Sequence, residues 1–449
     1  MLFYYKKFKS INLLNKLFEI LLYLCFLGKY DKMPHKSKII RDPIHGDIKL
    51  EGLFLDLIEA PEIQRLYNIK QLGFAHLVYP GAHHTRLEHS LGTYHMASKA
   101  AEVLNFDKDE KEIIACAAFL HDIGHGPFSH TLESLIRESL NVDHVDLTEK
   151  LIFGEHTIFE PYEIDYVGSS CVFDILDKNS IDKREIVSII RGKTHKKPYL
   201  SQILNSSIDV DQLDYLIRDS YYTGVAYGMI DIERFLQTLI IDKNRLAVKK
   251  KGIGVVENIL MARALMYSSV YFHKTVRIAE LMLSKAIEML INSKPFKFFK
   301  MTDNELLNEL KREDSYQREI VTRIKYRKLF KQAYFISKSN LSKNDINEIK
   351  KLENINYRRK KELEIEKSLG IPKGYIIIDV PFLELHQAEP RIDKTDILIV
   401  NENESKTLDQ YTPLAKAIKS REIPDWIVMI VTDEKYRNIV SKKSEDLLF

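Results

Sequence analysis

Cysteine is scarce in this sequence: its 449 residues include only Cys25, Cys116 and Cys171, which lie far apart. So few thiols, odd in number, exclude a framework of disulfide bonds and a zinc cluster held by thiolates. This cysteine usage is typical of a reducing compartment, and we therefore predict a cytoplasmic protein.

Net charge is also small, because 67 Lys and Arg residues nearly balance 64 Asp and Glu residues and leave +3. This balance provides no general electrostatic attraction to nucleic acid. Charged residues do gather over residues 302–368. We interpret that stretch as solvated amphipathic helices, with a basic surface for nucleic acid or another anionic partner as the alternative.

The sequence has no long hydrophobic run. Ile20–Leu27 is apolar and follows several lysines, but Lys16 and Glu19 interrupt the wider stretch, so no 18-residue apolar span exists. We interpret residues 1–33 as an N-terminal extension, from a start assigned ahead of Met33. A packing or surface helix and membrane attachment are the alternatives, and we expect no membrane partner.

Hydrophobic residues make up 45% of the chain, which is enough for a large core. The patterns predict a mainly α fold, with a helical domain over residues 34–290 and charged helices plus a smaller C-terminal α+β domain over residues 291–449. We expect helices over residues 56–72, 86–104, 111–122, 128–140 and 257–292, and strands over residues 375–380, 396–400 and 426–431.

Histidine is concentrated in one window, since nine of the 15 histidines lie between His76 and His144. Imidazole coordinates metals and transfers protons near neutral pH. His121-Asp122 ends an apolar helix, and His89 lies on a helix that we expect to be buried on two sides. A third segment supplies Asp209 or Asp211, and its spacing alone does not decide between them.

Two imidazoles and two carboxylates suit Mn, Fe, Zn or Ni and leave positions for water and substrate. We therefore predict one divalent transition metal, with Mg as a further ion on substrate phosphates. His125 lies four residues after His121 and can face the same pocket, and Arg86 precedes His89 by one helical turn, where it would donate to a phosphate.

Motifs in the same order as in a known family run from about residue 38 to residue 290. They are Asp42-Pro-Ile-His-Gly46, Gln64-Arg-Leu66, Ile69-Lys-Gln-Leu-Gly73, Tyr79-Pro-Gly-Ala82, Thr85-Arg-Leu-Glu-His-Ser-Leu-Gly92, His121-Asp-Ile-Gly-His-Gly-Pro-Phe-Ser-His130, Asp209-Val-Asp-Gln-Leu-Asp-Tyr-Leu-Ile-Arg-Asp219 and Tyr271-Phe-His-Lys274. With them the chain resembles the HD superfamily of metal-dependent phosphohydrolases, and most closely its deoxynucleoside-triphosphate triphosphohydrolase branch.

This resemblance implies an HD-domain helical bundle in which His89, His121, Asp122 and Asp211 bind one metal, so it favours Asp211 over Asp209. Close relatives usually have Asp where this chain has Glu133. Our hypothesis for catalysis is that His130, oriented by Glu133, protonates the leaving oxygen, while His125 and His144 contact phosphate.

The resemblance also assigns the nucleotide contacts. Gln71 and Leu72 match positions that read the 3′-hydroxyl and exclude a 2′-hydroxyl. The residues expected around the sugar and outer phosphates are Tyr215, Asp219, Tyr271 and Arg263. Gln212 departs from the pattern of this branch, because the mammalian member of the branch has a phosphate-contacting lysine at this position.

The predicted reaction is therefore dNTP plus water to deoxynucleoside plus triphosphate. One alternative keeps the metal site and acts on nucleoside monophosphates or cyclic nucleotides. An alternative of another class is a nucleic-acid-binding or scaffold protein that uses residues 302–368. The resemblance further implies a homo-oligomer, either a dimer or a tetramer.

Overall fold

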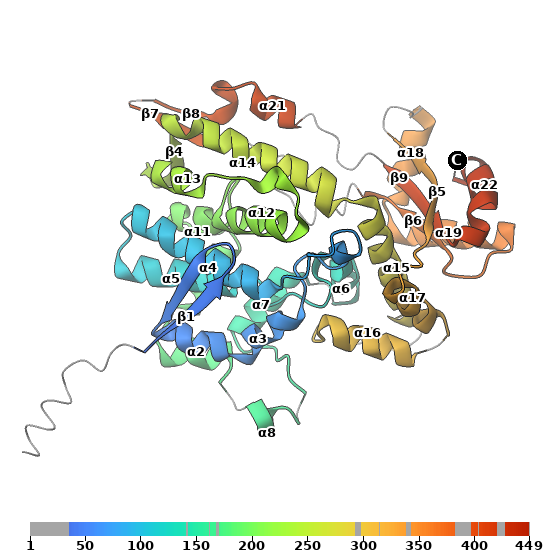
Figure 1. Cartoon of the computed structure of the whole chain (residues 1–449), viewed down its shortest axis with the longest axis horizontal. Helices are drawn as coiled ribbons and strands as arrows, with labels where there is room; N and C mark the ends of the chain where they lie inside the picture. The colour runs from blue at the N-terminus through green and yellow to red at the C-terminus, as the bar shows by residue number, and fades with distance from the viewer. Residues whose placement is uncertain are drawn as a thin grey trace, which may run out of the picture.

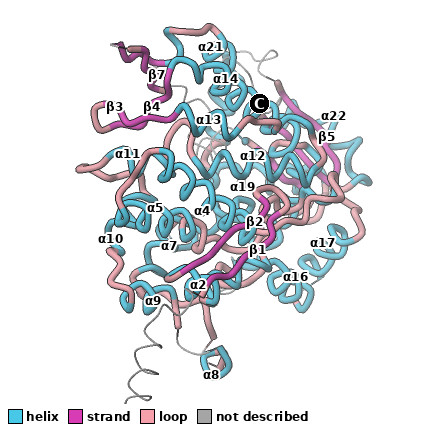
Figure 2. The backbone as a smooth tube through the Cα atoms, turned by 60° about the vertical axis from the view of Figure 1, so that its left-hand side comes forward, coloured by secondary structure: helices cyan, strands magenta, loops and turns pink. Residues whose placement is uncertain are grey.

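A computed structural model describes residues 36–140, 142–160, 162–167, 170–291, 298–313, 315–337, 343–381, 397–402, 404–419 and 427–448. The predicted extension over residues 1–33 lies outside them. Helices dominate the described residues, and the strands form small separate sheets among them (Figures 1 and 2). The predicted mainly α fold class is confirmed.

Three packed helices form the centre of the helical domain: α4 (Arg86–Val103), α5 (Lys108–Leu120) and α12 (Val210–Thr223). A capping box between Thr85 and Glu88 starts α4, and Asp107 caps α5. Both devices satisfy backbone N–H groups that a helix start leaves unpaired. Residues on opposite faces of α4 are buried, as its sequence predicted.

Further helices surround this centre. They are α2 (Leu53–Glu59), α3 (Pro61–Gln64), α6 (Glu133–Leu140), α7 (His144–Ile152), α8 (Ile164–Val167), α9 (Val172–Lys178), α10 (Lys183–Ile190), α11 (Pro198–Leu204), α13 (Ile232–Thr238) and α14 (Ile253–Met266). A hairpin of β1 (Ser37–Asp42) and β2 (Gly46–Glu51) precedes them and pairs antiparallel.

The helix predicted over residues 56–72 is wrong as a single element. Ala60 adopts an extended conformation, and a new short helix starts at Pro61. Proline disfavours a helical conformation at the preceding residue and lacks an N–H, so it ends one helix and suits the first turn of the next. The chain therefore turns at Ala60, and the loop with Gln71 follows a 3₁₀ turn over Arg65–Asn68.

The helix predicted over residues 257–292 is likewise divided. A π-helical turn over Tyr267–Tyr271 separates α14 from α15 (Lys274–Ile291). Among the described residues, Lys250–Tyr271 is long and apolar enough by length and composition to cross a membrane, and half of that window is buried inside the protein. Val256, Ile259 and Leu260 of this stretch belong to the hydrophobic core.

The C-terminal part places a small antiparallel sheet among helices, to the right in Figure 1. Its strand order is β5 (Lys331–Ile336), β9 (Val428–Thr432), β6 (Ile376–Asp379), and all residues of the central strand are buried. The strands predicted near residues 375–380 and 426–431 are thus present. The helices here are α16 (Asp303–Arg312), α17 (Ser315–Lys325), α18 (Lys343–Leu352), α19 (Ile355–Leu369) and α22 (Arg437–Leu448).

A later segment of the chain returns to the helical domain. The strand β7 (Leu398–Asn401) pairs in parallel with β4 (Arg245–Lys249), which also pairs with β3 (Leu239–Asp242). Next come β8 (Glu404–Thr407) and α21 (Leu414–Lys419), which lies over α14 in Figure 1. The domain boundary predicted near residue 290 stays a prediction, because hydrophobic side chains from both sides of it share the same cores.

Candidate active site

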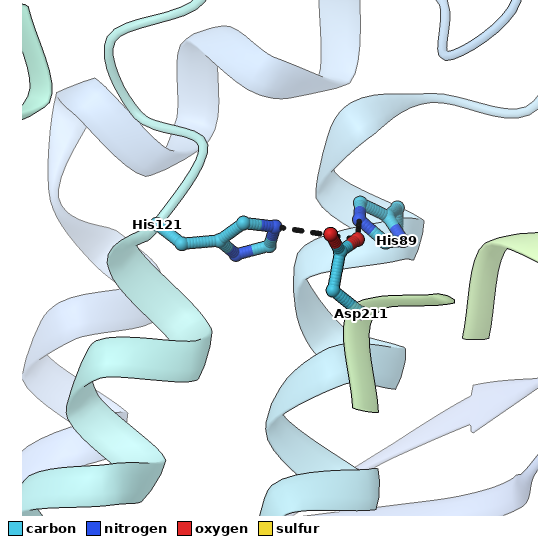
Figure 3. Close-up of side chains that lie close together, drawn as sticks. All are labelled: His89, His121 and Asp211. Atoms are coloured by element: carbon cyan, nitrogen blue, oxygen red, sulfur yellow. Dashed lines mark ion pairs between the residues drawn. The ribbon is translucent and has the colours of Figure 1, made fainter. Parts of the chain in front are cut away.

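Three side chains from three separate helices converge at the centre of the helical domain (Figure 3). His89 lies on α4, His121 follows the last turn of α5, and Asp211 lies in the first turn of α12. One ligand atom from each lies within 4.8 Å of the others. Asp211 Oδ1 is 3.0 Å from His89 Nε2 and 3.8 Å from His121 Nε2.

Asp122 adds a second carboxylate to this cluster. Its Oδ1 lies 3.3 Å from His121 Nε2, and its Oδ2 lies 3.8 Å from His89 Nε2. The Arg86 guanidinium, also buried, donates to Asp122 Oδ2. Burial raises the pKa of Asp122, but Arg86 and the neighbouring histidines hold it well below its usual range. The four predicted ligands are therefore close together, with a cation beside them.

The structure separates the two aspartates between which the sequence pattern did not decide. Asp209 is the N-cap of α12: its carboxylate accepts hydrogen bonds from the backbone N–H groups of Ser206 and Gln212, both at 3.0 Å. Capping occupies this side chain at the helix start. Asp211, inside the first turn, faces the imidazoles instead.

Each imidazole presents its Nε2 to the cluster because its Nδ1 is occupied elsewhere. Nδ1–H of His121 donates to the Ala118 carbonyl at 2.8 Å, and Nδ1–H of His89 donates to Asp214 Oδ2 at 2.8 Å. Nε2 of His121 is buried and has no hydrogen-bond partner among the described residues. Partners of this kind fix the tautomer of metal-ligating histidines. The donor set therefore fits a divalent transition metal.

Asp214 is the centre of a buried charge network behind His89. Its carboxylate accepts two hydrogen bonds from Arg218 at 2.9 Å and one from His45 Nε2 at 2.7 Å. Arg218 also donates to Asp42 at 2.7 Å. Burial raises the pKa of Asp214, but Arg218 and the two imidazoles lower it far more. These supporting residues were not predicted from the sequence, although Asp214 and Arg218 have the i, i+4 spacing of a helical ion pair.

A pair of stacked imidazoles lies next to the predicted ligands. The rings of His125 and His144 are 4.1 Å apart and nearly parallel, and His125 Nε2 lies 3.4 Å from Asp122 Oδ1. Glu133 Oε1 is 2.5 Å from His144 Nδ1. The His130 side chain lies outside the described residues, so its predicted pairing with Glu133 stays a prediction.

The two stacked rings have opposite protonation tendencies. Burial and the nearby cations Arg86 and His144 hold the pKa of His125 well below its usual range. Burial also lowers the pKa of His144, but the Glu133 carboxylate outweighs this effect and raises it. The pair therefore combines a neutral imidazole with one that retains its proton more readily.

The predicted sugar contacts lie together on α12 and the π-helical turn. The Tyr271 hydroxyl donates to Asp219 Oδ2 at 2.7 Å, and His84 Nε2 donates to Asp219 Oδ1 at 2.7 Å. The Tyr215 ring lies 6.0 Å from that of Tyr271 and 6.4 Å from that of His89. His84, which sequence reasoning did not single out, therefore holds one side of the Asp219 carboxylate.

The loop with Gln71 and Leu72 is attached to the start of α4. The Gln71 backbone N–H donates to the His84 carbonyl at 3.0 Å, and the Arg86 N–H donates to the Ile69 carbonyl at 2.9 Å. Leu72 is partly buried against the hydrophobic cores. These bonds place the predicted sugar-reading loop beside the segment that leads to His89.

Arg263 and Gln212, both expected near the outer phosphates, contact each other and are buried. Arg263 Nη1 donates to Gln212 Oε1 at 2.9 Å and to the Ser207 carbonyl at 2.8 Å. An amide at this position can accept from the guanidinium, whereas a lysine would repel it. The departure from lysine at position 212 therefore creates a partner for Arg263.

Comparison with known proteins identifies the class. Residues 86–219 match the HD domain family, and residues 230–449 match the family described as the HD associated region. An uncharacterized protein of Methanocaldococcus jannaschii is 35% identical over 91% of this chain and 82% of its own length. The chain belongs to the HD-domain family.

Two further proteins connect this family to an activity. The deoxynucleoside triphosphate triphosphohydrolase SAMHD1 of Gallus gallus is 29% identical over 70% of this chain, which spans 58% of that protein. The crystal structure of a phosphohydrolase from Bacteroides thetaiotaomicron has a TM-score of 0.66 at 27% identity, covering 89% of this chain and all of that one. With the ligand cluster described above, these similarities define an HD-domain phosphohydrolase.

Proposed function

We propose that the chain hydrolyses deoxynucleoside triphosphates to a deoxynucleoside and inorganic triphosphate. The observation that carries this proposal is the placement of the sugar contacts beside the predicted metal ligands. The Tyr215 ring lies 6.4 Å from that of His89 and 6.0 Å from that of Tyr271. A nucleotide whose sugar contacts Tyr215 would present its α-phosphate, the first phosphate after the sugar, to the ligand cluster.

The metal would be held by His89, His121, Asp122 and Asp211. When bound, a divalent metal polarises a phosphoryl oxygen and acidifies the attacking water. The remaining steps are those of the chain's own side chains. Buried Arg86 lies beside Asp122 and supplies positive charge where phosphate charge increases in the transition state.

The stacked histidines and the sugar pocket complete the proposal. His144, which Glu133 favours in its protonated form, donates to phosphate beside neutral His125. His130 protonates the 5′-oxygen as it leaves. On the sugar side, Tyr271 and His84 hold the Asp219 carboxylate in place for the sugar hydroxyl. Gln71 and Leu72 select a deoxyribose, in line with the resemblance to the triphosphohydrolases.

A second candidate reaction is hydrolysis of a nucleoside monophosphate, which releases orthophosphate, or of a cyclic nucleotide, which opens to a nucleoside monophosphate. The Arg263–Gln212 contact favours it, because it engages the arginine that would otherwise meet the outer phosphates. Binding to nucleic acid has less support, since many cations of residues 302–368 already pair with carboxylates. Examples are Arg312–Glu309, Arg323–Glu319, Lys351–Glu348 and Arg359–Glu138.

The identity of the product distinguishes the two reactions. The purified full chain would be incubated with each dNTP, each ribonucleotide, each deoxynucleoside monophosphate and the cyclic nucleotides, with Mn²⁺, Mg²⁺, Fe²⁺ or Ni²⁺. Ion-exchange chromatography would then separate the products. Inorganic triphosphate from dNTPs supports the proposal. Orthophosphate from a monophosphate, or a monophosphate from a cyclic nucleotide, with no triphosphate from any dNTP, supports the second candidate. The oligomeric state, which the same preparation would show by light scattering, stays a prediction of a dimer or tetramer.

A further inference from the structure

Residues 298–303 pack against the loop that contains His125. Gly126 of this loop has no Cβ, and a Cβ built there would lie only 3.4 Å from the Phe299 carbonyl oxygen. The same segment leads through Met301 to Asp303, the first residue of α16. Residues outside the match to the HD domain family therefore contact the loop that contains His125 directly. We call this loop, residues 123–128, the catalytic loop or His125 loop.

Asp303 bonds to two loops at once. Its Oδ1 accepts a hydrogen bond from the Phe128 N–H at 2.7 Å, and its Oδ2 accepts one from the Lys70 N–H at 3.0 Å. Asp303 is only 4% exposed. A buried carboxylate is costly unless its oxygens are hydrogen-bonded, and here each oxygen is bonded to a different loop.

Both loops carry residues of the candidate site. Lys70 immediately precedes Gln71, and Phe128 lies between His125 and His130. Phe128 has a φ of +54°, which is uncommon for a residue with a side chain. Such a conformation persists only where surrounding contacts hold it. Those contacts are the Asp303 carboxylate and the Phe74 ring, which stacks on Phe128 at 4.5 Å.

A buried cation holds the other end of the catalytic loop. Arg65 Nη2 donates to the carbonyls of Ile123 at 3.1 Å and His125 at 2.6 Å, and Arg65 Nη1 donates to the Met301 carbonyl at 3.3 Å. The loop is thus attached by its carbonyls to Arg65 and by one N–H to Asp303. Of these two side chains, Asp303 is the one that also bonds to the loop with Gln71.

We infer that Asp303 is a positioning residue that sets the distance between the Gln71 loop and the His125 loop. It touches neither substrate nor metal and acts through the backbone at Lys70 and Phe128. The roles of Gln71 and His125 rest on the proposed function, whereas the attachment of their loops does not. Because one loop places the sugar and the other places the phosphate, Asp303 would couple the positions of these two parts of the substrate.

The test compares Asp303→Asn with Thr302→Ala. Asparagine has a single acceptor oxygen, so one backbone N–H would lose its bond and face an amide NH₂. Thr302 is the N-cap of α16, and its side chain accepts from the Glu305 N–H. Replacing it weakens the same helix start without touching either loop. Asp303→Glu keeps both acceptor oxygens and serves as the conservative variant.

The first readout is hydrogen exchange, which needs no substrate. We expect faster exchange in the segments around residues 66–74 and 123–130 of Asp303→Asn, but not of Thr302→Ala. Unchanged exchange in Asp303→Asn, or the same change in Thr302→Ala, would overturn the inference. This readout stands even if no nucleotide is hydrolysed, so it separates the inference from the proposed function.

The second readout is kinetic, on whichever substrate the wild type hydrolyses. Because misplacement of about 1 Å can cost about 100-fold, we expect kcat/KM to fall about 10- to 100-fold in Asp303→Asn at unchanged metal content. A rise in KM should accompany the fall in kcat, since both loops shift. Asp303→Glu should recover part of the loss. If kcat and KM of Asp303→Asn match those of Thr302→Ala, Asp303 has no positioning role.

Discussion

Replacing Gly92 with alanine should disable the predicted metal centre, although Gly92 is not one of the predicted ligands. Gly92 lies on α4, one turn after His89. A Cβ there would lie 1.8 Å from Asp214 Oδ1 and 2.5 Å from Arg218 Nη2. Asp214 would have to retreat by at least about 1.6 Å, from 1.8 Å to the 3.4 Å at which van der Waals contact becomes ordinary. Its hydrogen bonds to His89 and Arg218, at 2.8 and 2.9 Å, do not survive such a shift.

The expected cost follows from these contacts. Overpacking a core costs about 1–3 kcal/mol, and breaking a buried ion pair costs about 3–5 kcal/mol. Alanine gains about 1 kcal/mol over glycine inside a helix. We therefore expect the free energy of unfolding to fall by about 3–7 kcal/mol. Loss of the His89 partner should also weaken metal binding about 10- to 100-fold.

Urea unfolding and metal content by elemental analysis measure the two effects. Gly254→Ala is the matched control, because Gly254 also lies inside a helix and a Cβ there meets nothing within 4 Å. The control should be neutral or gain up to about 1 kcal/mol. If Gly92→Ala is as stable as the control and retains its metal, the role assigned to the Asp214 network is refuted.

Three further predictions concern side chains of the site. Asp211→Ala should lose metal and turnover together, and full metal occupancy by elemental analysis would contradict its assignment as a ligand. His130→Ala should keep the metal but slow hydrolysis about 10²- to 10⁴-fold, so unchanged turnover would remove His130 from the mechanism. Burial lowers the pKa of His144, but the Glu133 carboxylate has the larger effect and raises it. His144 therefore loses its proton as the pH rises through this raised pKa. Glu133→Gln should therefore move the alkaline limb of the kcat/KM profile to lower pH, and an unmoved limb would argue against phosphate binding by His144.

The helices that position the site were predictable because their patterns are local. The capping box at Thr85 and the apolar run before His121 are visible in the sequence, and α4 and α5 follow them closely. The prediction of one helix over residues 56–72 was wrong because Pro61 ends the helix before it, in spite of the helical spacing of the apolar residues around it. The parallel pairing of β7 with β4 joins segments far apart in the chain, which short strands do not reveal by themselves.

The sequence likewise predicted only part of the candidate site. Residue types and their density indicated the predicted ligands, and the choice of Asp211 over Asp209 came from the resemblance. The cap at Asp209 supplies the structural reason for that choice. The supporting residues were not predictable, because their partners lie far away in sequence: Asp303 is 175 residues from Phe128, and His45 is 169 residues from Asp214. Only the folded chain brings these pairs together.

The measurement that tests the central claim most directly is hydrolysis of the four dNTPs in ¹⁸O-labelled water, with mass spectrometry of the products. Attack of water on the α-phosphate breaks its bond to the 5′-oxygen. The account predicts inorganic triphosphate that carries one ¹⁸O atom, together with an unlabelled deoxynucleoside. Labelled orthophosphate with no triphosphate, or label in the deoxynucleoside, would contradict it.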